Sequence, residues 1–143
     1  MSADYPSMTT AEIRSKFLNF FEERGLKLYP SSSLVPDDPS LLLANAGMNQ
    51  FKEYYQGKKT MKEIGAISCQ KCVRTNDIDC IGEDGRHLSF FEMLGDFSFG
   101  GVSKQQACAW AFELITKEFK LPLDRLYFTV FTEDDETHDV WRS

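Results

Sequence analysis

The fold is decided by two runs of sequence, SCQKCVR at residues 68–74 and RHLSFFEMLGDFSFG at residues 86–100. Both contain the apolar and aromatic residues that are typical of strands, and the polar stretch 75–85 separates them. We therefore predict two antiparallel strands, over 64–74 and 87–94, joined by that polar connection.

Charged and aromatic side chains at the ends of this hairpin would suit a nucleotide. His87 and Phe91 would share one strand face about 13 Å apart, which resembles the distance between the base and the outer phosphates of ATP. A base can stack on Phe91, and Arg74 can hold a phosphate through its forked guanidinium. Ordinary roles are also open: the aromatics as core, His87 as a structural histidine and Arg86 as a solvated turn charge. The hairpin alone leaves nucleotide binding unproven.

Composition places the chain among folded domains. With 143 residues, 42% hydrophobic and 13% aromatic, it can bury a core and lacks the signature of disorder. The net charge of −6 is the wrong sign for gripping nucleic acid by bulk electrostatics. No apolar run is long enough to cross a membrane, and the N-terminus does not resemble a signal peptide. We expect a cytoplasmic protein without membrane contact.

Four cysteines raise the alternative of a zinc or redox module. Cys69 and Cys72 form a C-x-x-C pair, but there is no second close pair of cysteines or histidines. In a strand, positions three apart face opposite sides, which does not suit shared ligation. We predict free thiols and no metal site.

The remaining pattern predicts an α+β domain with separate helices and strands. Residues 1–9 are expected to be a disordered lead-in, ending in a capping box between Thr9 and Glu12. The elements predicted outside the hairpin are helices over 10–24, 51–55 and 103–119, a helix that a cap at 132–135 opens and that reaches 141, and β-rich runs at 26–29 and 126–131.

From residue 10 to residue 141 the chain resembles the N-terminal catalytic region of alanyl-tRNA synthetases. The matching runs are AEIR at 11–14, SSSLVP at 31–36, DP at 38–39, NAGMNQF at 45–51, QKCVR at 70–74, FFEMLG at 90–95 and RLYFTV at 125–130. The resemblance implies a class II synthetase fold, an antiparallel sheet flanked by helices. Residues 10–143 would be the N-terminal part of that catalytic domain, truncated after motifs 1 and 2 and without motif 3.

The resemblance also implies roles for individual residues. Arg74 matches the catalytic arginine that contacts the α-phosphate of ATP and the activated carboxylate. His87, with the adjacent Arg86, matches the element near the outer phosphates, and Phe91 matches the ring that stacks on adenine. Met48 resembles a residue that lines the alanine pocket.

The implied function is that of an alanine–tRNA ligase, present here as an incomplete catalytic fragment. The enzyme joins alanine to ATP as alanyl-adenylate, with Mg²⁺ accompanying the nucleotide, and transfers the alanyl group to the 3′ end of tRNA-Ala. Its partners would be ATP, alanine and tRNA-Ala, the last through regions mostly absent here. The alternative is a stand-alone paralogue that binds a nucleotide or a partner without ligase activity.

Three departures from the family pattern bear on that alternative. The connection after Arg74 is short at residues 75–77 and has no lysine. The run GVSK at residues 101–104 replaces an aromatic segment, and Asp96 stands where the family commonly has asparagine.

Overall fold

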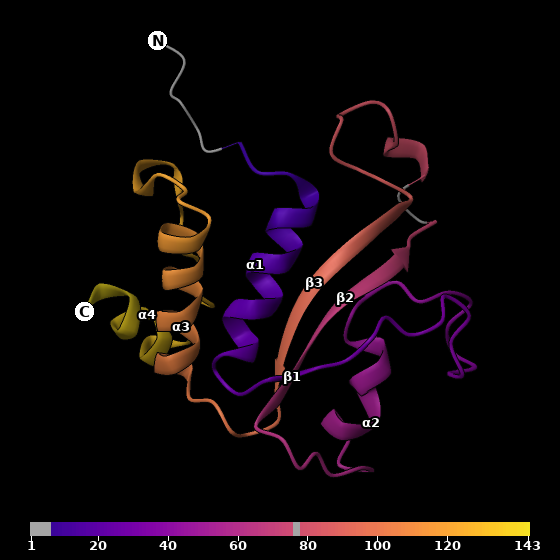
Figure 1. Ribbon diagram of the computed structural model, residues 1–143, viewed down its shortest axis with the longest axis horizontal. Coiled ribbons are helices and arrows are strands. Elements are labelled where there is room, and N and C mark those ends of the chain that lie inside the picture. The colour runs from indigo at the N-terminus through magenta and orange to yellow at the C-terminus, as the bar shows by residue number, and fades with distance from the viewer. Residues whose placement is uncertain (1–6, 76–77) are drawn as a thin grey trace.

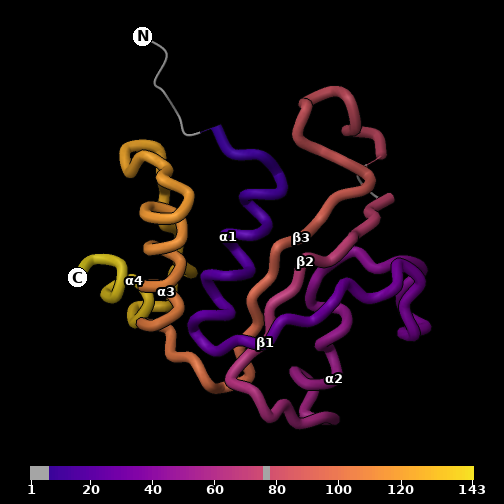
Figure 2. Tube along the Cα trace, viewed as in Figure 1, coloured from indigo at the N-terminus to yellow at the C-terminus, as the bar shows by residue number. Residues whose placement is uncertain are grey.

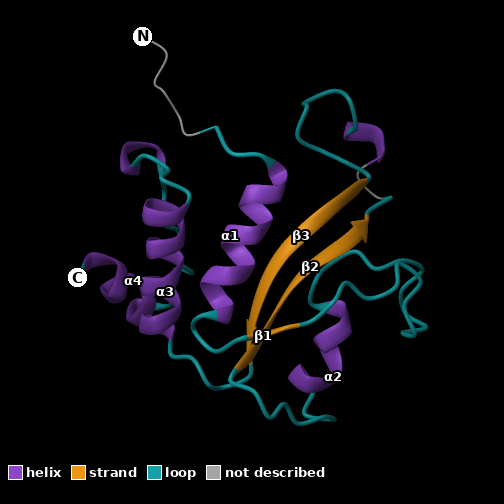
Figure 3. Cartoon of the chain, in the orientation of Figure 1, coloured by secondary structure: helices purple, strands orange, loops and turns teal. Residues whose placement is uncertain are grey.

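The computed structural model describes residues 7–75 and 78–143, in which helices and strands occupy separate stretches of an α+β domain (Figures 1 and 3). The elements follow in the order α1 (Thr10–Glu22), β1 (Lys27–Leu28), η1 (Asn49–Phe51), α2 (Lys52–Tyr55), β2 (Gly65–Val73), η2 (Ile78–Cys80), β3 (Phe90–Ser98), α3 (Lys104–Glu113), η3 (Leu114–Glu118), η4 (Leu123–Arg125) and α4 (Asp135–Arg142).

The predicted hairpin forms the centre of the sheet. β2 and β3 pair antiparallel along their whole lengths, from Gly65 opposite Ser98 to Val73 opposite Phe90. β1 lies on the other side of β2 and pairs with it in parallel, with Lys27 opposite Ala66. The small sheet is therefore mixed, and only its β2–β3 part has the antiparallel pairing expected throughout. Parallel pairing needs a long crossover, which the segment between β1 and β2 supplies.

One face of the sheet is covered by α1, and α3 lies on the far side of α1 (Figures 1 and 2). Thr9 and Glu12 form the predicted capping box at the start of α1. Gly25 ends the helix region with a φ of 87°, a conformation that glycine adopts without steric cost. The core on this side contains Phe17, Phe20, Phe21, Leu26, Ile67 and Leu114.

The opposite face is covered by α2 and the long loop that precedes it (Figure 3). Phe51 is almost completely buried there, and its ring lies 4.9 Å from that of Phe97. Tyr29 packs edge-on against Phe51 at 5.3 Å. This second aromatic cluster fixes the loop against the same sheet face that carries Phe91, because Phe91 and Phe97 lie six residues apart on β3.

Two of the predicted strands differ from the structure: one begins later than predicted, and the other does not form. β3 begins at Phe90, so His87 lies in the connecting loop and does not share a strand face with Phe91. Asp84 accounts for the difference: its Oδ1 accepts the N–H groups of Arg86 and His87, which forms a tight turn before the strand. The β-rich run 126–131 forms no strand, because no other strand lies beside it within the described chain.

The helix predictions held better. Ser103 caps α3 by accepting the Gln106 N–H, and the helical chain continues through the π-turn of η3 to Glu118. α4 begins after Asp134, which accepts the Thr137 N–H, and ends at Arg142. Of the expected lead-in at 1–9, residues 1–6 lie outside the described residues, and so do residues 76–77 of the short connection.

Candidate nucleotide site

Arg74 follows β2 directly and is held at two points. Its backbone N–H donates to the Ser89 carbonyl at 2.9 Å, which continues the hairpin pairing one step beyond the strand. Its side-chain Nε donates to the Asn45 carbonyl at 3.1 Å. No carboxylate within the described chain pairs with its guanidinium, so its positive charge remains available to an anionic ligand.

Phe91 lies beside Arg74, as the sequence predicted. The guanidinium carbon of Arg74 lies 5.3 Å from the centroid of the Phe91 ring, within cation–π range. Phe91 is half-buried on β3, opposite Cys72, and so leaves part of its ring accessible. Its neighbour Glu92 points to the α1 face, where Arg14 binds it at 2.6 Å and lowers the pKa of its carboxyl. A base stacking on Phe91 therefore meets a cation and no adjacent carboxylate.

The loop 44–48 closes one side of this corner. The Ala44 carbonyl accepts the Val73 N–H at 2.9 Å, and the buried Gly47 donates its N–H to the Sδ of Met93 at 3.2 Å. Met48 follows with an exposed side chain. Met48 is three residues beyond Asn45, whose carbonyl accepts a hydrogen bond from Arg74 Nε.

His87 and Arg86 occupy a separate, exposed turn. His87 Nδ1 lies 2.6 Å from Asp84 Oδ2, while Asp84 Oδ1 accepts the two backbone N–H groups of the turn. These backbone hydrogen bonds, ahead of the ion pair with His87, lower the pKa of Asp84 to about 2. No hydrogen bond or ion pair among the described residues joins this turn to Arg74 or Phe91. The structure brings Arg74, Phe91 and the Met48 loop together, but not His87 and Arg86.

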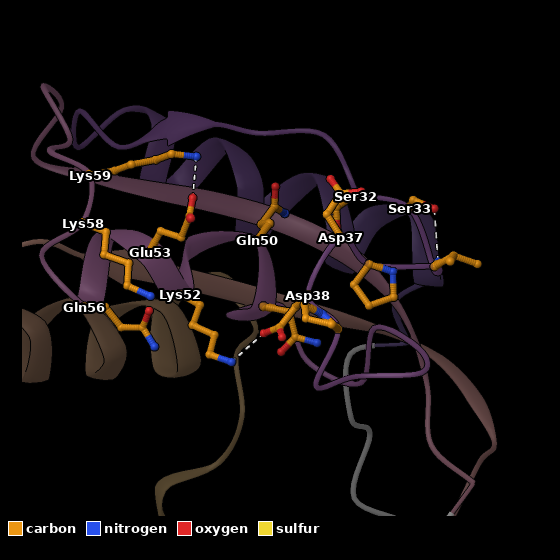
Figure 4. A pocket seen from close by; sticks show the side chains of 14 residues that line it. Ser32, Ser33, Asp37, Asp38, Gln50, Lys52, Glu53, Gln56, Lys58 and Lys59 are labelled. Carbon is orange, nitrogen blue, oxygen red and sulfur yellow. Dashed lines mark hydrogen bonds and ion pairs between the residues drawn. The ribbon is translucent and has the colours of Figure 1, made fainter.

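A separate hollow lies elsewhere among the described residues. It has a volume of about 630 Å³ between α2 and the loop 32–39 (Figure 4). Lys52 binds Asp38 across it at 2.5 Å, and Lys59 pairs with Glu53 at 2.5 Å. Its charges are thus largely matched within the protein, and none of the predicted site residues lines it.

The two cysteines of the C-x-x-C pair lie in β2, as expected. Cys72 is fully buried on the face of Phe91, and Cys69 is partly buried on the α1 face. Burial raises the pKa of both thiols. Within the described chain, no three histidine, cysteine or acidic side chains gather as a metal site.

The contacts of three side chains were not predicted from the sequence: those of Gln70, Met93 and Asp84. Gln70 is 1% exposed, and its side chain bonds the backbone of Ser32 and the side chain of Gln50. Gln70 is a polar residue at an inward-facing strand position, and this is the signal from which such a network could have been predicted. The sequence pattern gave Met93 no role beyond the core. The Asp84-Gly85 pair is a turn signal, and it outweighed the strand pattern that predicted a strand from residue 87.

Comparison with known proteins places this geometry in a family. A family model described as tRNA synthetases class II (A) matches residues 12–143, and the chain belongs to that family. It is similar to the alanine–tRNA ligase of Synechocystis sp., with 51% identity over 142 residues, covering 99% of this chain and 16% of that protein. The chloroplastic/mitochondrial alanine–tRNA ligase of Sorghum bicolor is 53% identical over 131 residues, covering 92% of this chain and 14% of that protein.

A third relative, the alanine–tRNA ligase of Pseudothermotoga lettingae, is 50% identical over 135 residues, which cover 94% of this chain and 16% of that protein. The chain therefore spans about one sixth of the length of these curated relatives or less. These matches confirm the family resemblance found in the sequence. No helix of the described residues has the length and apolar character needed to cross a bilayer.

Proposed function

We propose that this chain supplies the ATP-holding part of an alanine–tRNA ligase and corresponds to the N-terminal portion of its catalytic domain, with motifs 1 and 2. One observation carries the proposal: Arg74, without a carboxylate partner among the described residues, lies at the hairpin end over the accessible ring of Phe91. Relatives named alanine–tRNA ligase at 50–53% identity support the choice of amino acid and reaction.

In the proposed reaction, an oxygen of the alanine carboxylate attacks the α-phosphorus of ATP. The bond from that phosphorus to the bridging oxygen breaks, and pyrophosphate leaves. Arg74 neutralises charge at the α-phosphate and the carboxylate, while Phe91 stacks on adenine. Positioning and charge neutralisation supply the catalysis, and no side chain acts as a nucleophile.

The outer phosphates are assigned to His87 and Arg86. For His87 to reach them, the turn at 84–87 must bring its ring toward the hairpin end, and Asp84 competes with the phosphates for the ring. We propose that Mg²⁺ arrives bound to the triphosphate and supplies further charge neutralisation there. Met48 is assigned to the alanine pocket, and tRNA-Ala to regions mostly outside this chain.

A second candidate is a nucleotide-binding or partner-binding paralogue without ligase activity. The departure at residues 101–104 favours it, because it changes the segment that follows β3. The ligase and a nucleotide-binding paralogue both require ATP binding at Arg74 and Phe91, whereas a partner-binding paralogue does not. A cytoplasmic location remains a prediction, since the names of some relatives specify chloroplast or mitochondrion and others do not.

ATP binding is tested first, by titrating the chain with Mg·ATP and comparing two variants. Arg74→Ala should weaken binding at least tenfold, because it removes a charge-assisted phosphate contact. Lys71→Ala is the matched control: Lys71 is exposed in the same strand, three positions earlier, and should leave binding unchanged. Equal losses in both variants would show that only net charge matters.

Alanine-dependent ATP–pyrophosphate exchange tests the reaction itself. We expect the chain to bind ATP weakly and to give little or no exchange, because it spans at most 16% of the length of the relatives compared. Robust exchange that Arg74→Ala abolishes would make this chain a self-sufficient activating unit and overturn the fragment interpretation.

A further inference from the structure

Met93 makes a contact that the proposed reaction does not use. It lies on β3 opposite Gln70, on the sheet face shared with Phe91. Its thioether sulfur accepts the backbone N–H of Gly47 at 3.2 Å. Sulfur is a weak acceptor, and a buried N–H without any partner is costly, so this contact is the one that satisfies the Gly47 amide.

The recess that receives Gly47 is closely fitted. A Cβ added to Gly47 would lie 3.2 Å from the Phe97 ring and 3.8 Å from the Met93 sulfur. The Phe97 ring itself lies across Gly95, where an added Cβ would approach it to 2.5 Å. Two glycines therefore make room for a close approach of the loop to the sheet, and Met93 holds the loop at that approach.

The same loop controls Arg74. Ala44 is fully buried and its carbonyl accepts the Val73 N–H, while the next residue, Asn45, offers its carbonyl to Arg74 Nε at 3.1 Å. Gly47 is only two residues beyond Asn45. A shift of the loop away from Met93 therefore moves the carbonyl that orients the guanidinium.

We propose that Met93 is a positioning residue: through the Gly47 N–H it seats the loop 44–48, and through the Asn45 carbonyl it sets the direction of the Arg74 guanidinium. The structural part of this inference stands on the contacts above. Its consequence for ATP rests on the function proposed for Arg74.

Met93→Leu is the decisive variant, because leucine keeps a similar volume and removes the sulfur acceptor. The chain offers a matched control in Met61→Leu, which removes another sulfur acceptor, the one that receives the Tyr29 hydroxyl at 3.3 Å. The readouts are proton exchange at the Gly47 amide and at Arg74 Nε–H, followed by NMR on ¹⁵N-labelled chain, and the Kd for Mg·ATP.

In Met93→Leu we expect exchange at both groups to accelerate about fivefold, the effect of losing one neutral hydrogen bond, and the Kd for ATP to rise by a similar factor. Met61→Leu should leave all three unchanged. Unchanged exchange in Met93→Leu, or equal changes in the two variants, would overturn the proposal. If the parent chain binds no ATP, the proposed function fails, while exchange at Gly47 and Arg74 still decides the role of Met93.

A measurement on the unsubstituted chain covers the case in which Met93→Leu does not fold. The amide of Met48, next to Gly47, has no hydrogen-bond acceptor within the described residues, so it serves as an internal reference. The Gly47 amide should exchange at least about fivefold more slowly than the Met48 amide. Equal exchange rates would contradict a sulfur-bound Gly47.

Discussion

Arg74 and His87 flank the same connection between β2 and β3, but the protein holds them in different ways. Arg74 is fixed by hydrogen bonds to two separate segments, at Ser89 and Asn45, and lies against Phe91. His87 is exposed, and among the described residues its side chain is hydrogen-bonded only to Asp84 of its own turn. In the proposed site, the side at Arg74 is therefore preorganised, and we call it the fixed wall. The side at His87 must move to reach the same ligand, and we call it the mobile wall.

The difference follows from what lies beneath each residue. At the Arg74 corner, the last part of β2 is buried at Gln70 and Cys72. Under the turn of His87 there is no buried residue: the described positions from 78 to 90 are exposed or only partly covered. Local opening costs little where few apolar contacts are lost, so we expect motion at the turn and rigidity at Arg74.

Removal of the Gln70 side chain is expected to have the largest effect on the fixed wall. Gln70→Ala removes the partner of the Ser32 N–H and carbonyl and one acceptor of the Gln50 amide in a partly buried setting. We expect the free energy of unfolding to fall by about 2–4 kcal/mol. Urea denaturation measures it, with Lys71→Ala, expected within about 0.5 kcal/mol of the parent, as the control. A loss as small as that of the control would mean that the network contributes little.

Arg74→Lys tests the fixed wall with less disruption. Lysine keeps the charge but loses the planar fork and the Nε donor that the Asn45 carbonyl orients. We expect ATP affinity to fall about tenfold, and the stability of the fold to change little. Calorimetric titration gives the Kd. Affinity equal to that of the parent chain would show that charge alone, and not orientation, matters at this position.

A substitution of Asp96 is expected to have a smaller effect than the substitutions at the fixed wall and a larger one than a substitution at the mobile wall. The residue is exposed overall, but it borders a hollow of about 180 Å³ whose lining includes Leu26, Val102 and Trp110, and the loss of water there raises the pKa of its carboxyl. A raised folded pKa favours the protonated acid, so the folded state loses stability as pH rises through that pKa.

Asp96→Asn should therefore raise the melting temperature at pH 7.5 and have little effect at pH 3.5, where the parent carboxyl is mostly protonated. Thermal unfolding at the two pH values checks this. A decrease at both values would mean that the carboxylate makes a favourable contact with its surroundings.

The smallest effect is expected at the mobile wall. The pKa of Asp84 is lowered to about 2, so its contribution is present above its unfolded pKa near 4 and is lost as pH falls through about 2. In Asp84→Asn the amide oxygen can still accept the two backbone N–H groups, but the charge beside His87 is gone. Because the turn is exposed, we expect the free energy of unfolding at pH 7 to fall only slightly, and amide exchange at Arg86 and His87 to rise.

A comparison of exchange at those two amides with exchange at the Arg74 amide tests the difference between the two walls directly. The Arg74 amide, which donates to Ser89, should not respond to Asp84→Asn. A response at Arg74 would show that the two walls form one cooperative unit.

The same contrast explains which features could be predicted from sequence. The capping box at Thr9 was predictable because neighbouring residues specify it. The two strands of the hairpin were predictable from their own apolar and aromatic residues, although the second begins three residues later than predicted. The parallel position of β1 depends on where a long crossover returns, which no local pattern encodes. The strand expected at 126–131 failed although its residues favour β-structure, since a strand also needs a neighbour; Tyr127 and Phe131 are left largely exposed.

At the site, the placement of Arg74 and Phe91 in one hairpin followed from the strand pattern and the family resemblance. The residues that support Arg74 and Phe91 could not be predicted in this way. Gln70 and Met93 act on loops distant in sequence, and their partners are visible only in three dimensions. His87 was misplaced because the hydrogen bonds of one aspartate to its own turn outweighed the extended pattern of the following residues.

The most direct test is an NMR titration of the labelled chain with Mg·ATP, comparing the hairpin site with the lysine-lined hollow in Figure 4. We predict saturable shifts at Arg74 Nε–H and the Phe91 ring, with His87 and Arg86 responding as the turn moves toward the phosphates. Shifts confined to the hollow around Lys52, Lys58 and Lys59, with Arg74 and Phe91 unmoved, would contradict the assignment of the nucleotide site.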